Sequence, residues 1–213
     1  KLTSGDFSIG RVTAVYNGRQ QGANVRLNGS DWPSNITVFY KKEGTTTPLV
    51  DQDGNYIEPT DAGKYKVFVK VEGDGIYTDV PELFIDYFEI TAKAMDGATI
   101  EGIPEQTYTG TDIKPEVKVK DNGKTLEAVD YTVAYEKNLN VGTATVIVTG
   151  KGNYTGEQKI DFTIKAKSIT YEMIADIPNQ FLNYTEVKPT IVVEHGQKVL
   201  VEDTDYTVAY ENN

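Results

Sequence analysis

Few side chains in this sequence have the type and surroundings needed for binding or chemistry. The single tryptophan, Trp32, lies in a Ser-Asp-Trp-Pro-Ser stretch that is typical of a loop. An indole ring in a loop can stack on a sugar ring or anchor a protein partner, since tryptophan is enriched at binding hot spots. Trp32 is therefore the one candidate ligand-binding residue. The alternative is a tryptophan that closes one end of a hydrophobic core, because tryptophan is usually well buried.

A second stretch has the oxygen-rich composition of a calcium site. Asp51, Asp53 and Asn55 place oxygen atoms at every second residue. A calcium loop of the EF-hand type also needs a glycine at its sixth position and a glutamate at its twelfth. Counted from Asp51, Gly54 is too early and Ala62 stands where the glutamate should be. We therefore expect a hairpin turn here and no metal site.

No set of residues with a recognisable catalytic role is present. His195 is the only histidine and the chain has no cysteine, so we expect a solvated turn residue. Two carboxylates about 5–9.5 Å apart in a cleft can hydrolyse glycosides, but among 32 acidic residues no pair stands out. We predict no catalytic residue, no cofactor and no enzyme. A polysaccharide hydrolase is the least favoured alternative.

The composition excludes several classes of protein. The 213 residues include 21 basic and 32 acidic side chains, a net charge of -11. Such a chain repels phosphate backbones, so we expect no nucleic-acid partner. No apolar run approaches the ~20 residues that cross a bilayer, so we expect no membrane span in this segment. With 38% hydrophobic residues the chain has a globular composition.

Internal repetition organises the sequence into three units. The heptapeptide DYTVAYE at 130–136 recurs letter for letter at 205–211. Shorter matches extend the frame in both directions, and a more divergent copy precedes it. They pair Lys114-Pro115 with Lys188-Pro189, Phe88-Glu-Ile90 with Phe162-Thr-Ile164, Tyr16-Asn-Gly18 with Tyr108-Thr-Gly110, and 62–69 with 141–148. We predict a divergent first β-domain at 1–89, a second β-repeat at 90–165 and a third at 166–213.

The third unit is shorter than the second. Asn213 matches Asn138, and the second unit continues from there through two further runs of strand type. A third unit that lacks its last two strands would leave a sheet edge and part of its core uncovered. We therefore expect the natural chain to continue beyond this sequence.

Alternation of apolar and polar residues predicts strands almost everywhere. In 131–135, Tyr131, Val133 and Tyr135 share one face of a strand, as do Tyr206 and Tyr210 in the third unit. These tyrosines form a stacking ladder for glycans or, as we favour, part of a core. Short strands separated by Asn-Gly and Asp-Gly turns indicate an all-β chain. We expect tandem small antiparallel β-sandwiches.

One corner favours an immunoglobulin-like topology. Tyr65 follows Asp61-Ala-Gly-Lys and stands two residues before Val67, as the corner tyrosine of that fold stands before its second cysteine. Such a tyrosine donates its hydroxyl proton to backbone a few residues upstream. The second unit has Ala144 at this place, so small β-grasp-like sheets remain the alternative.

The run at 140–156, preceded by 130–135, carries a family resemblance. It resembles the tandem repeats of large bacterial cell-surface proteins of the adhesin type, which are grouped as MBG or bacterial Ig-like domains. The first unit resembles a sister subtype through Tyr16-Asn-Gly18 and 59–65. The third unit departs at Leu182-Asn-Tyr184. The resemblance implies an extracellular, surface-displayed, non-enzymatic protein and supplies no catalytic motif.

Two functions follow from these observations. The first is a non-catalytic segment of a bacterial surface protein that acts as an adhesin stalk or spacer and takes part in cell adhesion, with neighbouring repeats of the same chain as partners. The second is a glycan- or host-protein-binding module centred on the first domain and Trp32.

Overall fold

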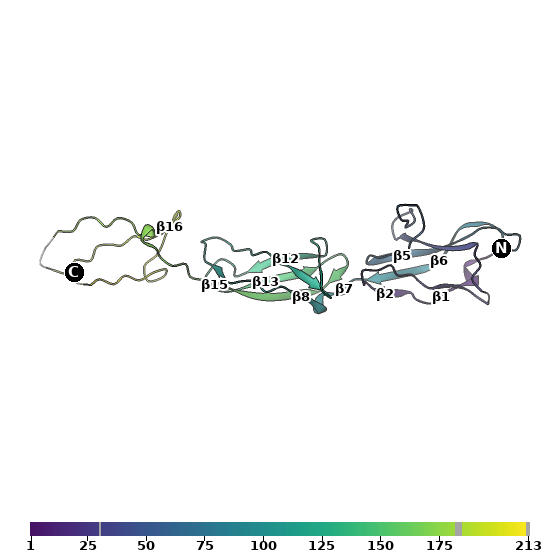
Figure 1. Ribbon diagram of the computed structural model, residues 1–213, viewed down its shortest axis with the longest axis horizontal. Coiled ribbons are helices and arrows are strands. Elements are labelled where there is room, and N and C mark those ends of the chain that lie inside the picture. Colours follow the sequence, from purple (N-terminus) through teal and green to yellow (C-terminus); the bar gives the residue numbers. More distant parts are fainter. Residues whose placement is uncertain (30, 182–184, 212–213) are drawn as a thin grey trace. The chain divides into compact units, whose positions relative to one another are not determined.

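The computed structural model describes residues 1–29, 31–181 and 185–211, and over these residues the chain is all-β (Figure 1). The helical turns among them are the short 3-10 turns η1 (Ser4–Asp6), η2 (Met95–Gly97) and η3 (Tyr171–Met173). The prediction of an all-β chain is confirmed. Buried and exposed side chains tend to alternate along the strands, as expected for a sheet with one covered face.

The chain folds into two compact units that do not follow the sequence repeats. Unit 1 comprises residues 1–101, 117–134 and 147–159, and unit 2 comprises 102–116, 135–146 and 160–213. The boundaries at 89/90 and 165/166 stay predictions. We call the ranges 1–89, 90–165 and 166–213 the first, second and third segments.

The first segment, which lies in unit 1, contains a two-stranded and a four-stranded sheet. The small sheet pairs β1 (Phe7–Ile9) with β3 (Val25–Leu27). The larger sheet has the order β2-β6-β5-β4, formed by β2 (Thr13–Val15), β4 (Ile36–Lys42), β5 (Gly63–Val71) and β6 (Val80–Thr91). The small sheet packs on the larger one through Phe7 and Leu27, which contact Ile36, Val69 and Val71.

The larger sheet is mixed, which corrects the prediction of purely antiparallel sheets. β4, β5 and β6 run antiparallel, but β2 pairs with β6 in parallel, with Ala14 opposite Ile90. Further parallel pairs join β9 (Gln106–Thr107) to β15 (Glu157–Lys165) and β14 (Tyr154–Thr155) to β7 (Lys93–Ala94). Alternation along a strand reports which face is buried and not the direction of its neighbour, so the sequence pattern could not reveal these pairs.

The second segment repeats this arrangement with shorter strands. Its four-stranded sheet has the order β12-β13-β15-β9, and a three-stranded sheet has the order β11-β10-β8. The strands are β7 (Lys93–Ala94), β8 (Ala98–Ile100), β9 (Gln106–Thr107), β10 (Val119–Asp121), β11 (Lys124–Thr125), β12 (Tyr131–Glu136), β13 (Gly142–Gly150), β14 (Tyr154–Thr155) and β15 (Glu157–Lys165).

Matched apolar residues fill matched positions in the first two segments. Phe88 and Ile90 at the end of β6 are buried, and so are Phe162 and Ile164 at the end of β15. Each such side chain contributes about 1.5–3 kcal/mol when it leaves water. The Phe-x-Ile ending is therefore the shared anchor of both sheets.

Among the described residues, the third segment has only the hairpin of β16 (Glu194–His195) and β17 (Lys198–Val199) as regular strands. Its remaining contacts still follow the second segment. Ile174 forms a β-bridge with Val193, at the positions that match Ile100 and Val119 of the β8–β10 pair. Val193 is buried like Val119. The segment thus reproduces one part of the arrangement found in the second.

Turns fall where glycine and asparagine were expected. The two residues between β10 and β11, Asn122 and Gly123, have φ values of 48° and 81°, the left-handed conformation that a tight hairpin requires. Gly196, between β16 and β17, has φ 63°. These residues are the ones that adopt positive φ at little cost, so the hairpin turns were predictable.

Tyr65 makes the corner hydrogen bond predicted for it. Its hydroxyl donates to the Asp61 carbonyl oxygen at 2.7 Å, and its ring is buried. Burial and, to a smaller extent, the Asp61 carboxylate raise the pKa of the Tyr65 phenol, so the hydroxyl remains a donor. The bond fixes the chain immediately before β5, the central antiparallel strand of the larger sheet.

We expect Tyr65→Phe to lower the free energy of unfolding by about 1 kcal/mol, because the buried hydroxyl donates to a backbone carbonyl. Trp32 is the only tryptophan and lies in the same segment, so urea unfolding followed by its fluorescence measures the loss. The matched control is Tyr56→Phe, which removes the hydroxyl of an exposed ring stacked on Phe39. Equal destabilisation by the two variants would contradict the structural role of the Tyr65 hydroxyl.

Candidate functional site

Trp32 lies immediately before β4 with its ring partly open to solvent. The ring is 41% exposed, and its indole nitrogen donates to the Ile36 carbonyl oxygen at 3.1 Å. One edge meets Phe7 with the ring centres 6.2 Å apart. The indole is thus held in place on one side while the other side can be contacted from solvent. This placement is compatible with the ligand-binding hypothesis and with a role as an edge of the core.

The Asp51 loop uses its carboxylate internally. One carboxylate oxygen of Asp51 accepts the backbone N–H groups of Asp53 and Asn55, and the other accepts the side-chain amide of Asn55. These donors, the Asn55 side chain first, lower the pKa of Asp51. Over the ranges that the structure describes, no group of three or more His, Cys, Asp or Glu side chains could hold a metal ion.

The four repeated tyrosines use their hydroxyls to hold loops. Tyr135 donates to the Pro115 carbonyl oxygen at 2.6 Å and Tyr206 donates to that of Ile191 at 2.7 Å. The bonds at the remaining positions join Tyr131 to Val117 and Tyr210 to Pro189. Their rings are half-buried, and burial raises the pKa of Tyr135 and Tyr206. Each ring therefore contributes one side to packing, in keeping with the core interpretation.

An aromatic row on the outer face of the larger first-segment sheet was not singled out from the sequence. Phe39 on β4 stacks on Phe68 on β5 with ring centres 5.3 Å apart, and Phe68 meets Phe84 on β6 edge-on. Tyr56 stacks on Phe39 at 4.9 Å, and Tyr56 and Phe84 are each about two-fifths exposed. The signal was present in the sequence, because Phe39 and Phe68 have the opposite strand parity to the core residues Tyr40 and Val67.

Within unit 1, one turn of the second segment contacts the first segment directly. We call residues 151–156, between β13 and β15, the Asn-Tyr turn. The Asn153 side chain accepts the Ala62 backbone N–H at 2.7 Å and donates to the Asp61 carboxylate at 3.0 Å. The Tyr154 ring meets Tyr16 edge-on, with ring centres 5.5 Å apart. A single amide side chain thus binds both a donor and an acceptor of the preceding segment.

A buried charge network supports the Asn-Tyr turn from behind. The ammonium of Lys93 lies 2.6 and 2.7 Å from the two carboxylate oxygens of Asp121. The Tyr154 hydroxyl donates to the same carboxylate at 3.1 Å, and burial, followed by this carboxylate, raises the pKa of Tyr154. β14 of the turn pairs with β7, so Tyr154 lies opposite Lys93. The network fixes the ring that contacts Tyr16.

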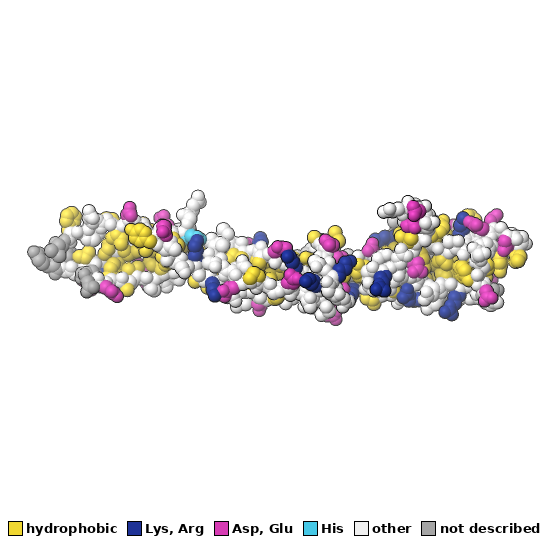
Figure 2. Space-filling model, in the orientation of Figure 1, with side chains coloured by type: hydrophobic (Ala, Val, Ile, Leu, Met, Phe, Trp, Pro, Cys, Tyr) yellow, Lys and Arg dark blue, Asp and Glu magenta, His cyan; other side chains and the backbone are white. Residues whose placement is uncertain are grey.

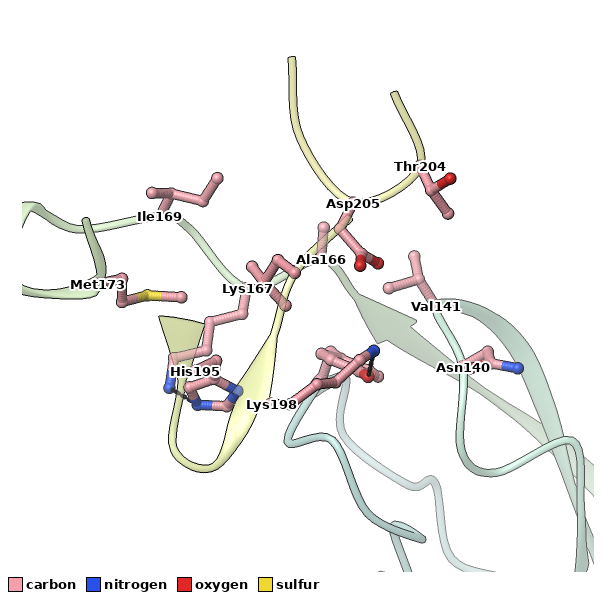
Figure 3. A pocket seen from close by; sticks show the side chains of 12 residues that line it. Asn140, Val141, Ala166, Lys167, Ile169, Met173, His195, Lys198, Thr204 and Asp205 are labelled. Carbon is pink, nitrogen blue, oxygen red and sulfur yellow. Dashed lines mark hydrogen bonds between the residues drawn. The ribbon is translucent and has the colours of Figure 1, made fainter. Parts of the chain in front are cut away.

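Within unit 2, a pocket of about 420 Å³ is lined by residues of the second and third segments (Figure 3). Its wall includes Tyr108, Asn140, Val141, Ile169 and His195. Figure 3 shows the side chains of Val141, Ile169 and Asp205 on different sides of it. Apolar and polar groups share the lining, so the pocket suits an occupant with both an apolar body and hydrogen-bonding ends.

The prediction of a freely solvated His195 is wrong. His195 is half-buried on β16, and its Nε2 atom lies 2.6 Å from the Lys167 ammonium (Figure 3). Lys198 from β17 donates to the Tyr108 hydroxyl at 3.2 Å. The third-segment hairpin therefore brings His195 and Lys198 to the pocket, although they were not predicted to line one.

The comparisons with known proteins leave the family open. A scan against protein-family models finds no match, and a search of curated proteins finds none either. Among the described residues, no helix has the length and apolar character required to cross a membrane.

We expect Asn153→Ala to loosen the contact between the first and second segments, because it removes both side-chain hydrogen bonds to Asp61 and Ala62. Spin labels at Asp86→Cys and Thr132→Cys meet no competing thiol, since the chain has no cysteine. The measured distance distribution should be narrow in the parent chain and clearly broader in the variant. Asn28→Ala, which removes an exposed asparagine elsewhere in the first segment, is the control. Equal widths in all three chains would contradict a fixing role for Asn153.

Proposed function

We propose that the chain is a non-catalytic, extracellular segment of a bacterial surface protein, acting as a spacer in an adhesin-type stalk. The observation that carries this proposal is the contact of the Asn-Tyr turn with Asp61 and Ala62. Consecutive segments with no linker between them and a two-point hydrogen bond across the junction suit a part that holds its neighbours in a fixed orientation. A flexible linker would lack both features.

The finer fold that we propose for each segment is an immunoglobulin-like sandwich. Its support is the corner bond of Tyr65 to Asp61 and the packing of the β1–β3 sheet on the four-stranded sheet. A β-grasp domain would cover its sheet with a helix, whereas here the covering layer in the first segment is a second sheet. The sequence resemblance to MBG-type and bacterial Ig-like repeats supports the same choice.

The surface chemistry supports an exposed, soluble spacer. With a net charge of -11, neighbouring chains repel one another in solution. Figure 2 shows acidic and basic side chains interspersed on the face in view. The Lys41–Glu82 pair joins β4 to β6 across β5, and the Lys120–Glu101 pair joins β10 to the residue after β8. Exposed pairs contribute little stability, so their main effect is to keep the sheet faces polar.

An antibody against residues 1–213 tests the proposed location. On cells that produce the protein, we expect it to label intact cells as strongly as permeabilised ones, because a stalk segment lies outside the envelope. An antibody to a cytoplasmic protein serves as the control and should label only permeabilised cells. Labelling confined to permeabilised cells or lysates would contradict the proposal.

A second candidate function is binding of glycan or host protein by the first segment. The observation that favours it is the partly exposed indole of Trp32, which is held rigidly by Ile36 and Phe7. A preformed aromatic surface loses little conformational entropy when a sugar ring stacks on it. The exposed ends of the aromatic row, Tyr56 and Phe84, offer further stacking surface in the same segment.

Glycan-array screening of the chain tests this candidate. If a glycan binds through the indole, Trp32→Ala should reduce the signal about tenfold or more, since buried aromatic contacts dominate binding energy. Tyr171→Ala, which removes an aromatic ring that is 84% exposed in the third segment, should leave it unchanged. An array without any signal, or equal losses in both variants, would rule out a Trp32-centred site.

A further inference from the structure

The pocket of unit 2 is built from residues that match those around the Asn-Tyr turn in unit 1. We call the residues of unit 1 that contact the Asn-Tyr turn the receiving side. Among them, Tyr16 donates its backbone N–H to the Thr91 carbonyl oxygen at 2.9 Å. In unit 2, Tyr108 donates to Lys165 at 2.8 Å, at the matching positions. The parallel pairs β2–β6 and β9–β15 produce this geometry in both units. Both units therefore present a tyrosine from the same strand edge.

The next residues of the receiving side also correspond. Asp61 and Ala62 precede β5 and bind the Asn153 side chain. Asn140 and Val141 precede β13 in the same way, and both line the pocket. The carboxamide of Asn140 offers an acceptor oxygen, as the Asp61 carboxylate does. Unit 2 thus also has groups that can form hydrogen bonds with an asparagine side chain.

The opposite wall repeats the charge network with one exchange. Lys93 and Asp121 form an ion pair in unit 1. Their matches in unit 2 are Lys167 and His195, whose nitrogen atoms lie 2.6 Å apart, and both line the pocket. A histidine has replaced the aspartate that accepts the Tyr154 hydroxyl. The position of the hydrogen-bonding partner is kept, while its charge is lost.

Exposure shows where the two sites differ. Met95 is fully buried in unit 1, and a side chain added at Gly150 would collide with it, so the start of the turn covers it. Its match, Ile169, is 41% exposed and lines the pocket. Leu126 is buried, whereas its match Leu200 is only half-buried. No Asn-Tyr turn lies over Ile169 within the described part of the chain.

We propose that this pocket is a socket for a second Asn-Tyr turn, carried at the tip of a β-hairpin with the sequence character of residues 142–165. Such a turn has the mixed chemistry that the lining requires, because the tyrosine ring is apolar and the asparagine side chain both donates and accepts. Val141 N–H and Asn140 would bind the asparagine, and the tyrosine ring would pack between Tyr108 and His195.

The strands of that hairpin also have a place to bind. In the second segment β13 is the neighbour of β12, and the residues that match β12 are 206–211. Tyr206 and Tyr210 already hold this stretch through the same hydroxyl bonds as their counterparts. Figure 2 shows apolar side chains gathered on the face in view over the third segment, at the left of the picture. An added hairpin would cover this apolar surface and pair with 206–211 as β13 pairs with β12.

The experiment extends the full chain at its C-terminus with a second copy of residues 139–165, since Asn213 matches Asn138. Amide hydrogen exchange is compared between the extended and the original chain. We expect exchange at 206–211 and at Ile169 to slow about tenfold or more on extension, because pairing and burial protect amides. Unchanged exchange at these positions would overturn the proposal.

Two variants distinguish specific binding of the Asn-Tyr turn from nonspecific hydrophobic association with the apolar face. In the first, the Asn and Tyr of the added copy are both replaced by Ala, and we expect the protection to be lost. Equal protection by this copy would overturn the proposal.

The second variant is His195→Asp, which restores the carboxylate found in unit 1. We expect it to raise the protection of the extended chain about tenfold, because a carboxylate can accept a tyrosine hydroxyl and a lysine ammonium at once, as Asp121 does. It should leave the original chain nearly unchanged. Equal effects in both chains, or none in either, would overturn the assignment of His195 to the socket. None of these outcomes depends on whether the protein lies at a cell surface.

Discussion

A scarcity of buried surface governs the structure. Segments of this size bury only about 60% of the surface that their unfolded chains expose, and with no cysteine in the chain no disulfide compensates. The stabilising contacts therefore come from large side chains that both bury a ring and make a hydrogen bond. Tyr65, Tyr135 and Tyr206 each have a buried or half-buried ring and bind a backbone carbonyl through the hydroxyl. A buried carbonyl left without a donor would cost about 1–3 kcal/mol, so each such bond protects a loop that the small core could not hold alone.

The same scarcity explains why contacts at the segment boundary are so specific. The Asn-Tyr turn is part of the second segment, yet its tyrosine ring lies against Tyr16 and its asparagine binds Asp61 and Ala62. A turn that extends out of its own segment gains burial from the neighbour. The Lys93–Asp121 pair is partly buried beside it, with side chains 27% and 10% exposed, and removing one partner of such a pair leaves the other charge poorly solvated.

Much of the fold could be predicted from the sequence because it is local. Alternation identified the strands, Asn122 and Gly123 marked their hairpin, and the position of Tyr65 two residues before Val67 predicted its backbone bond. The parallel pairing of β2 with β6 could not be predicted, because it depends on a crossover that leaves no local pattern. The aromatic row was readable from strand parity at Phe39 and Phe68, but we had considered only the tyrosine repeats.

The candidate sites were harder to predict than the fold. Trp32 was identified by residue type alone, and the structure adds its partial exposure and its two anchors. The pocket of unit 2 depends on residues from 108 to 205 meeting in space, which no spacing rule describes. His195 was predicted to be a solvated turn residue because no cysteine or second histidine is present to complete a site. In the structure His195 contacts Lys167, which matches Lys93, the ion-pair partner of Asp121. The pairing in the matched segment therefore predicts the contact of His195 better than its residue type does.

Segments of related sequence joined in series face the danger that a turn of one binds the wrong neighbour during folding, a characteristic failure of repeat proteins. Asp121 presents a carboxylate where the matching residue His195 presents an imidazole. The two sites therefore differ in the hydrogen bonds that they can form, although their other residues correspond. If the pocket of unit 2 is such a socket, the two sites would bind their turns with different affinities, and a one-residue difference would favour one order of assembly along the chain.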